Sequence, residues 1–297
     1  HPFAVEIKDF TKPVDIPAVD VPAGYTTLFV FPYSVGFQFS GFKNLAALNE
    51  AITKRLKNLG VTTLLFMRHL ELIEYEIKIP GKEASGEYLL DAEPINDHCT
   101  RVSAIESEDD KTDESLSFIK FSMPIDSRVS TRTIDVAFTV ATDKEGKTTF
   151  QKAKNPYISV YFPTETESKL DFIVQGPFRT TPNRSSVPAD EEENEALAEQ
   201  TAKLLRQSVL ELRDMGLLDL SLIRILPLDE DDFDVYPLFY PLYEEMRDLF
   251  SSERVLPVKD GKGYTKAANA VIARSREIAE LLPSELISEL INGKRHY

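Results

Sequence analysis

Two stretches in the middle of the chain alternate between large apolar residues and smaller or polar ones, and this period of two limits the fold more than any other feature. Successive side chains of a β-strand point to opposite faces, so the pattern predicts strands with one buried face. Half-buried strands of this kind are typical of antiparallel sheets. The alternating apolar positions are Ile119, Phe121, Met123 and Ile125 in the first stretch and Ile134, Val136, Phe138 and Val140 in the second.

Turn-forming residues follow the second stretch. The run Asp143-Lys144-Glu145-Gly146 predicts a hairpin turn. Short apolar segments predict further strands at residues 64–79, 157–162 and 170–174. The acidic run at residues 106–114 is interpreted as a solvated hairpin tip. Together these segments predict a mainly antiparallel sheet accompanied by at least one helix, which is an α+β domain.

The N-terminal part is punctuated by prolines. Residues 5–22 contain Pro13, Pro17 and Pro22, and each proline fixes φ and removes a backbone donor, so an extended connector is predicted. Residues 25–31 form a short β-branched and aromatic run, which predicts a strand. In residues 44–59 leucine and isoleucine recur every three or four positions, which predicts an amphipathic helix that ends at Gly60.

After Pro188 the spacing of apolar residues changes from two to three or four. A long amphipathic helix is predicted over residues 197–212, ending at Gly216, and a second over residues 239–250. Residues 255–265 carry two short apolar segments around a Gly-rich turn, which predicts a small β-hairpin. Two final helices are predicted at residues 275–282 and 284–291, on either side of Pro283.

The length of 297 residues accommodates two domains of ordinary size. With 42% hydrophobic and 28% charged residues, the chain has the composition of a folded globular protein. We predict three regions: a connector and strand at residues 1–35, an α+β domain at 36–188, and a helical subdomain with a small hairpin at 189–297.

The charge and the cysteine content argue against several classes of function. A formal charge of −15 repels phosphate backbones, so we expect no nucleic-acid partner. No run approaches the roughly 20 apolar residues that span a bilayer, so we expect no membrane partner. A single cysteine, Cys99, cannot form an intramolecular disulfide, which favours a reducing, cytoplasmic location. The chain begins at His1 without an initiator methionine, and we interpret it as a piece of a longer polypeptide or as a processed one, although trimming of a tag would produce the same start.

The stretch at residues 175–188, QGPFRTTPNRSSVP, is the most informative candidate site. It stands between a predicted strand and a long helix, and Gly176 and three prolines restrict it. Arg179, Asn183, Arg184 and several hydroxyls make it rich in hydrogen-bond donors, and a guanidinium can bind a phosphate through two parallel bonds. The alternative is a polar connection whose arginines pair with the acidic residues 190–193 just downstream.

The sequence GPFRTTPNR, followed by a long helix with Asn194 in its first turns, resembles the catalytic loop in the middle domain of HtpG-class heat-shock proteins. It is more similar still to large bacterial proteins with a sacsin-like GHKL ATPase domain. The run GYTTLFVFP at residues 24–32 resembles the closing strand of such a nucleotide domain, and residues 49–68 resemble the start of the transducer domain that follows it. The resemblance therefore implies a transducer-like α+β domain of the ribosomal S5 type, in a bacterial multidomain parent.

The resemblance also implies a function. In this family a loop arginine reaches the γ-phosphate of ATP held by the preceding domain; Arg184 matches that arginine best, Asn183 lies beside it, and Arg179 is a second candidate. The chain lacks the Glu and Asn pair that holds magnesium and the glycine motifs of the adenine pocket and lid. We therefore expect no complete cofactor or metal site and no activity in this chain alone, with ATP and magnesium bound in the parent. The expected partners are the upstream nucleotide-binding domain and protein clients.

Two other functions stay open. The chain could be a nucleotide-independent interaction or scaffold module, in which the loop arginines hold a neighbouring protein or domain. It could also be an independent hydrolase, although no carboxylate pair stands out among the 49 acidic residues.

Several other motifs favour structural interpretations. His98 and Cys99 have no further ligand at metal-binding spacing, and the acidic run at 229–234 lacks the glycine and terminal glutamate of a calcium loop. The aromatic segment at 236–250 is interpreted as a helix packed in the core, or alternatively as a surface that presents Phe239, Tyr240 and Tyr243 to a partner.

Overall fold

The computed structural model describes residues 43–79, 81–108, 111–126, 129–259 and 263–270. The chain divides into two compact units, residues 1–56 and 57–297. Helix α1 (Leu45–Lys57) begins after Asn44, whose side chain accepts a hydrogen bond from the Ala47 amide at 2.8 Å, and the chain turns at Gly60 with φ +84°. The predicted helix at 44–59 is therefore confirmed. The predicted connector, the strand at 25–31 and the two final helices lie outside the described residues.

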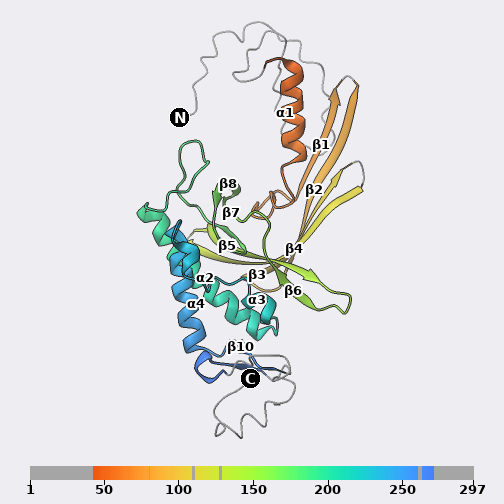
Figure 1. Cartoon of the computed structure of the whole chain (residues 1–297). Helices are drawn as coiled ribbons and strands as arrows, with labels where there is room; N and C mark the ends of the chain where they lie inside the picture. Colours follow the sequence, from red (N-terminus) through yellow and green to blue (C-terminus); the bar gives the residue numbers. More distant parts are fainter. Residues whose placement is uncertain (1–42, 80, 109–110, 127–128, 260–262, 271–297) are drawn as a thin grey trace. The chain divides into compact units, whose positions relative to one another are not determined.

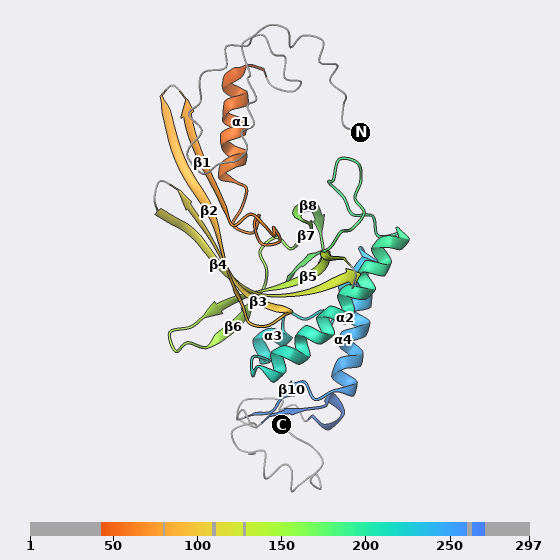
Figure 2. The same ribbon diagram turned by 180° about the vertical axis from the view of Figure 1, so that it is seen from behind.

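The larger unit, residues 57–297, is built on a nine-stranded sheet (Figures 1 and 2). Every pair of neighbouring strands is antiparallel except β7 and β9, and this confirms the predicted α+β class with a mainly antiparallel sheet. The strands lie in the order β1 (Leu72–Ile79), β2 (Lys82–Pro94), β3 (Cys99–Glu108), β4 (Lys111–Asp126), β5 (Val129–Thr142), β9 (Ile173–Gln175), β7 (Tyr157–Val160) and β8 (Phe162–Glu167), and β6 (Thr148–Gln151) also pairs with β5.

The two alternating stretches form the central strands β4 and β5, paired with Phe121 opposite Val136. Strand β5 then turns into β6 through the predicted hairpin, where Gly146 has φ +83° and its amide donates to the Asp143 carbonyl at 3.1 Å. Strands β3 and β4 form the predicted acidic hairpin. Their pairing continues through most of residues 106–114, the predicted tip, up to Glu108 opposite Lys111.

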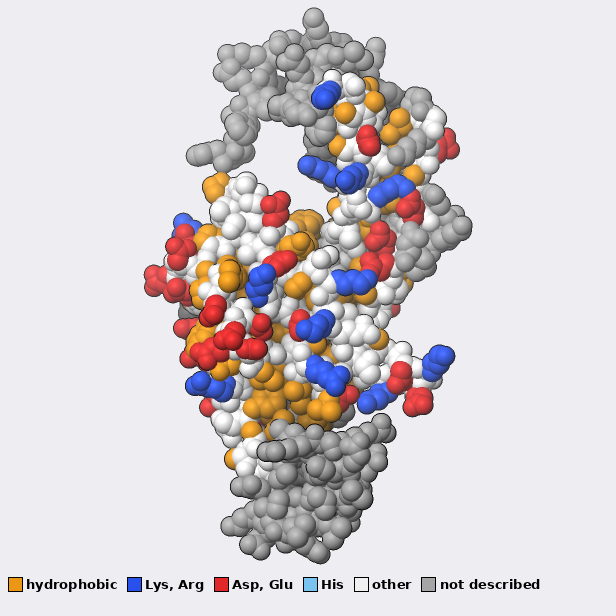
Figure 3. Space-filling model, in the orientation of Figure 1, with side chains coloured by type: hydrophobic (Ala, Val, Ile, Leu, Met, Phe, Trp, Pro, Cys, Tyr) orange, Lys and Arg blue, Asp and Glu red, His pale blue; other side chains and the backbone are white. Residues whose placement is uncertain are grey.

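Helices cover one face of the sheet. The longest helix, α2 (Glu192–Asp214), packs against β4 and β5 and against α4 (Tyr240–Ser252). A guanidinium nitrogen of Arg206 in α2 donates to Glu245 at 2.9 Å and to Asp248 at 2.8 Å, both in α4, and acidic side chains gather over this region in Figure 3. Both predicted helices and the small hairpin are confirmed. The remaining elements are α3 (Leu220–Ile223), 3-10 turns at Asp231–Phe233, Pro237–Phe239 and Ala267–Asn269, and the paired strands β10 (Leu256–Pro257) and β11 (Tyr264–Thr265).

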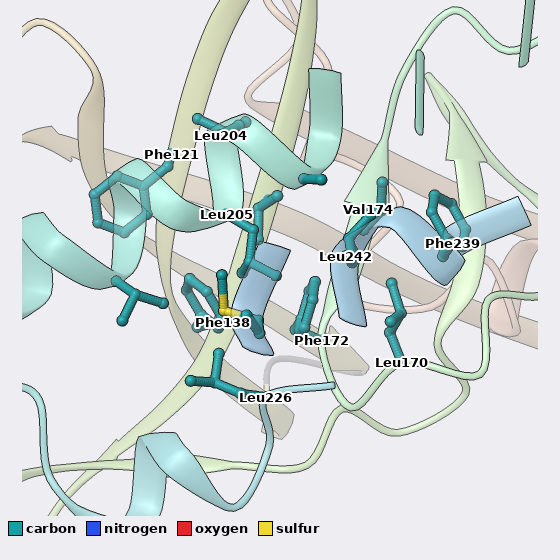
Figure 4. Close-up of a cluster of buried hydrophobic side chains, with 14 of the residues drawn as sticks. Phe121, Phe138, Leu170, Phe172, Val174, Leu204, Leu205, Leu226, Phe239 and Leu242 are labelled. Atoms are coloured by element: carbon teal, nitrogen blue, oxygen red, sulfur yellow. The ribbon is translucent and has the colours of Figure 1, made fainter. Parts of the chain in front are cut away.

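The two faces of the sheet have separate hydrophobic cores. On the helical face, Phe138 and Phe172 lie with their ring centroids 5.2 Å apart, and Leu205 of α2 packs into the same cluster (Figure 4). On the other face, Phe118 and Ala137 are covered by residues 61–67. Because the helices share a core with the sheet, they form a layer of one unit; the predicted domain boundaries at residues 35 and 188 stay predictions.

Three predicted strands are wrong in extent. Residues 61–66 form mostly buried turns, and only residues 72–79 of the segment 64–79 are a strand, because the apolar run at 64–67 signals burial without deciding the local structure. The segment 157–162 is two antiparallel strands, β7 and β8, since Tyr161 has φ +65° and reverses the chain. The strand predicted at 170–174 is shifted to Ile173–Gln175.

Candidate functional site

The candidate site is the arginine loop, residues 176–188, which connects β9 to the start of α2. Its first residue requires glycine, since a Cβ on Gly176 would lie 2.8 Å from the Phe178 ring. The Gly176 amide donates to the Ser159 carbonyl at 3.1 Å. Phe178 is buried and meets Phe239 edge to face, with ring centroids 5.9 Å apart. The start of the loop is therefore held between strand β7 and the helical layer.

Asn194, in the first turn of α2, ties the two ends of the loop together. Its side chain is fully buried. The side-chain oxygen accepts from the Arg179 amide at 2.7 Å, and the side-chain nitrogen donates to the carbonyls of Arg179 at 3.0 Å and Pro188 at 2.8 Å. All three bonds join side chain to backbone, so Asn194 sets the path of the loop through its main chain.

A tight turn forms the tip of the loop. The Arg184 amide donates to the Thr181 carbonyl at 2.8 Å, and the Thr181 amide donates to the Ser186 carbonyl at 2.9 Å. The Asn183 side-chain oxygen accepts from the hydroxyls of Thr181 at 2.7 Å and Ser185 at 2.9 Å. Asn183, a predicted site residue, thus uses its carbonyl oxygen to brace the turn.

The returning half of the loop is attached to strand β8 and to the helical layer. The Glu165 amide donates to the Ser185 carbonyl at 3.0 Å, and the Val187 amide donates to the Thr166 hydroxyl at 3.0 Å. The Tyr236 hydroxyl donates to the Val187 carbonyl at 2.7 Å, and burial raises the pKa of Tyr236. Neighbours on several elements therefore hold the backbone of the loop.

The two predicted arginines lie on this loop in different settings. Arg179 is exposed and pairs with Glu191 at 3.1 Å, as the structural alternative predicts. Arg184 is also exposed, but among the described residues it has no ion pair; its guanidinium donates to the Val160 carbonyl at 3.0 Å. Its backbone has φ +59°, a left-handed conformation that costs a non-glycine residue of order 1–3 kcal/mol. The loop thus presents two guanidinium groups, each with further donors available to an anion.

A buried polar cluster lies beneath the start of the loop, and sequence reasoning missed it. Asp135 of β5 is 6% exposed and accepts hydrogen bonds from Ser122 and from Thr133, the latter at 3.0 Å. In the orientation that satisfies both groups, the side-chain nitrogen of Gln175 donates to the same carboxylate, directly before Gly176. Burial raises the pKa of Asp135 and lowers the pKa of Lys120, whose ammonium donates to the Leu65 carbonyl at 3.2 Å. The sequence did contain a signal for this cluster, because Lys120 and Asp135 are charged residues within the two alternating stretches that form β4 and β5.

The other motifs have structural roles. Cys99 begins β3, is fully buried, and has its pKa raised by burial to about 12, so its thiol is inert at neutral pH. Phe239 is also fully buried, which confirms core packing for this part of the aromatic segment. The hydroxyls of Tyr240 and Tyr243 both donate to Glu230, at 2.9 and 3.4 Å. Within the described ranges, no group of three or more His, Cys, Asp and Glu side chains is arranged to hold a metal ion.

In the part of the chain that the structure describes, no helix combines the length and apolar character needed to cross a bilayer. The chain matches no protein-family profile, no curated protein and no solved structure.

Proposed function

We propose that this chain is the coupling region of a longer ATP-driven, chaperone-like protein, in which the arginine loop presents Arg184 to the phosphates of a nucleotide held by an upstream GHKL domain. One observation carries the proposal: Arg184 is exposed and free of carboxylate partners among the described residues, on a loop whose backbone is hydrogen-bonded to α2, β7 and β8. A charged donor held in place before reaction stabilises developing charge without the cost of reorganisation.

Each residue of the loop has a distinct part in this mechanism. Arg184 neutralises charge on the transferred phosphoryl group, and Arg179 is the second cation, available once it leaves Glu191. Asn183 and Asn194 act as positioning residues, since both bind the loop backbone or its hydroxyls. Because the arginine arrives only when the domains close, hydrolysis depends on domain geometry, which couples ATP to movement. Magnesium and adenine are expected to be held by the upstream domain.

The test is ATP hydrolysis by the intact parent protein carrying Arg184→Ala. The proposal predicts a loss of roughly a hundredfold or more in kcat, the usual scale for removing such a donor. Lys169→Ala is the matched control, because Lys169 is also an exposed cation with positive φ, +63°, and lies outside the loop. If Arg184→Ala and Lys169→Ala hydrolyse ATP equally fast, Arg184 does not act on the nucleotide.

A second candidate is a nucleotide-independent interaction module, and one observation favours it. At the tip of the β7–β8 hairpin, Tyr161 and Phe162 are 37% and 49% exposed, next to the Val160 carbonyl that Arg184 binds. Arginine and aromatic residues dominate the binding energy of many protein interfaces. This candidate predicts that Arg184→Ala leaves hydrolysis intact, and that Phe162→Ala changes the domain arrangement seen by small-angle scattering equally with and without nucleotide.

A further inference from the structure

A cavity of about 380 Å³ lies beside the β7–β8 hairpin, entirely within the unit 57–297. This volume is at the lower end of the range of small-molecule sites, about 300–1,000 Å³. Its apolar lining comes from buried side chains of the turn segment and of β9, namely Val61, Phe66 and Ile173. Leu59, Leu116 and Pro163 add further apolar surface, and the polar lining comes from residues 58–62, from β4, from β7 and β8, and from the loop before β7.

The most telling lining residue is Ser159. It is 2% exposed, and among the described residues nothing hydrogen-bonds its hydroxyl. Asn58, Thr62 and Asn155 also line the cavity with side chains that bond to no other described group. Asn58 and Asn155 are exposed and Thr62 is half-buried, so their hydrogen-bonding groups face solvent and are available to an occupant. The cavity therefore offers several unused donors and acceptors to an occupant.

The charges at the cavity point to an uncharged occupant. Its cation and its carboxylate, Lys154 and Glu114, pair with each other at 2.9 Å on the exposed rim. The ammonium is thus already neutralised, and the net charge of −15 opposes the approach of anions. A phosphate or carboxylate ligand that approached Lys154 would meet the carboxylate of Glu114 beside it.

The polar groups also define a chemical class. Amide side chains, here Asn58 and Asn155, match the paired donor and acceptor on the edge of a nucleobase. Aromatic rings, here Phe66 and Tyr157, provide surfaces on which a base can stack. We propose that this cavity binds an uncharged small molecule that carries a nucleobase, of the size of a nucleoside.

Binding at this cavity would reach the arginine loop through a single hairpin. Ser159 lines the cavity, and its carbonyl accepts the Gly176 amide. The next residue, Val160, accepts the Arg184 guanidinium, and Glu165 donates to the Ser185 carbonyl. An occupant that orders β7 and β8 should therefore stabilise the loop as well. The proposal does not depend on the proposed ATP function, because binding and loop stability are measured without ATP.

Titration calorimetry of the 297-residue chain with adenosine, guanosine, cytidine and uridine tests the proposal. At least one nucleoside should bind saturably, and Ser159→Ala and Asn155→Gly should each weaken it by about tenfold, the scale of one lost hydrogen bond. Asn155 has φ +52°, so glycine keeps the backbone while removing the amide. Lys169→Gly is the matched control, since it makes the same backbone change at φ +63° outside the cavity and should bind normally.

Two further measurements complete the test. The corresponding nucleoside 5′-monophosphate should bind more weakly than the nucleoside, and hydrogen exchange of the loop amides of Arg184 and Val187 should slow when the nucleoside binds. The assignment is overturned if none of the four nucleosides binds saturably, if the monophosphate binds as tightly, or if both cavity variants bind like the wild type. Binding with unchanged exchange at the loop would refute the link to the arginines.

Discussion

Replacing Asn194 with alanine should release the arginine loop and destabilise the unit that carries it. The side chain is fully buried and makes three hydrogen bonds, to the amide and carbonyl of Arg179 and to the carbonyl of Pro188. Alanine removes all three bonds and leaves three backbone groups without their partner. The helix itself should persist, because alanine is the best helix former and Asn194 does not cap it.

The expected loss in the free energy of unfolding is about 2–4 kcal/mol. A buried polar group that loses its partner costs about 1–3 kcal/mol. The summed cost for three such groups is therefore an upper limit, and it lies well above the expected loss. The actual cost is lower because Arg179 is exposed and Pro188 is half-buried, so water can reach part of the released backbone. In a domain of this size each kcal/mol lowers Tm by roughly 2–4 °C.

Urea unfolding followed by circular dichroism measures this loss, provided that the slope of the unfolding free energy against urea concentration is the same in the variant and the wild type. Ser208→Ala is the matched control: Ser208 lies on the same helix and is equally buried, but its hydroxyl only donates to the Leu204 carbonyl, at 2.8 Å. Its replacement should change stability by less than about 0.5 kcal/mol. Asn194 does not hold the loop if Asn194→Ala costs no more than Ser208→Ala, or if the Arg179 amide keeps its protection from hydrogen exchange.

Gly86→Ala should lower the free energy of unfolding in urea by about 1–3 kcal/mol, because a Cβ there would meet ring atoms of Tyr75 at 2.5 and 2.7 Å. The loss should largely vanish in a Tyr75→Ala background. A loss that persists in that background would contradict the steric cause. Leu205→Ala should cost about 2–5 kcal/mol because Leu205 is fully buried, while Leu220→Ala, at a site 61% exposed, should cost little by the same assay. Burial raises the pKa of Asp135, so its contribution to stability is complete below the unfolded pKa and is lost as pH rises through the folded pKa. Asp135→Asn should therefore gain on the wild type from about pH 4 upward, by at most about 1.4 kcal/mol per pH unit, and a gain that shrinks as pH rises would contradict this.

The candidate site shows how far local sequence signals extend. That a donor-rich, restricted loop lies between a strand and a helix follows from its glycine, prolines and arginines, and the structure agrees. The pairing of Arg179 with Glu191 was one of two alternatives, and the structure shows it for that arginine alone. The contact of Arg184 with Val160 had no signal, because it joins residues 24 positions apart through a backbone carbonyl.

The central strands, the helices α2 and α4 and the turn at Gly146 can be predicted from the sequence, because hydrophobic period and turn chemistry act over a few neighbouring residues. The same short-range signals do not predict that residues 61–66 are mostly buried turns, or that Tyr161 reverses the chain between β7 and β8. The turns and the chain reversal depend on the burial of one face of the sheet and on hydrogen bonds to backbone groups that are distant in the sequence. The hydrogen bonds from Asn194 to the arginine loop and the cavity beside β7 and β8 become visible only in the folded chain, because both are made by segments that meet after folding.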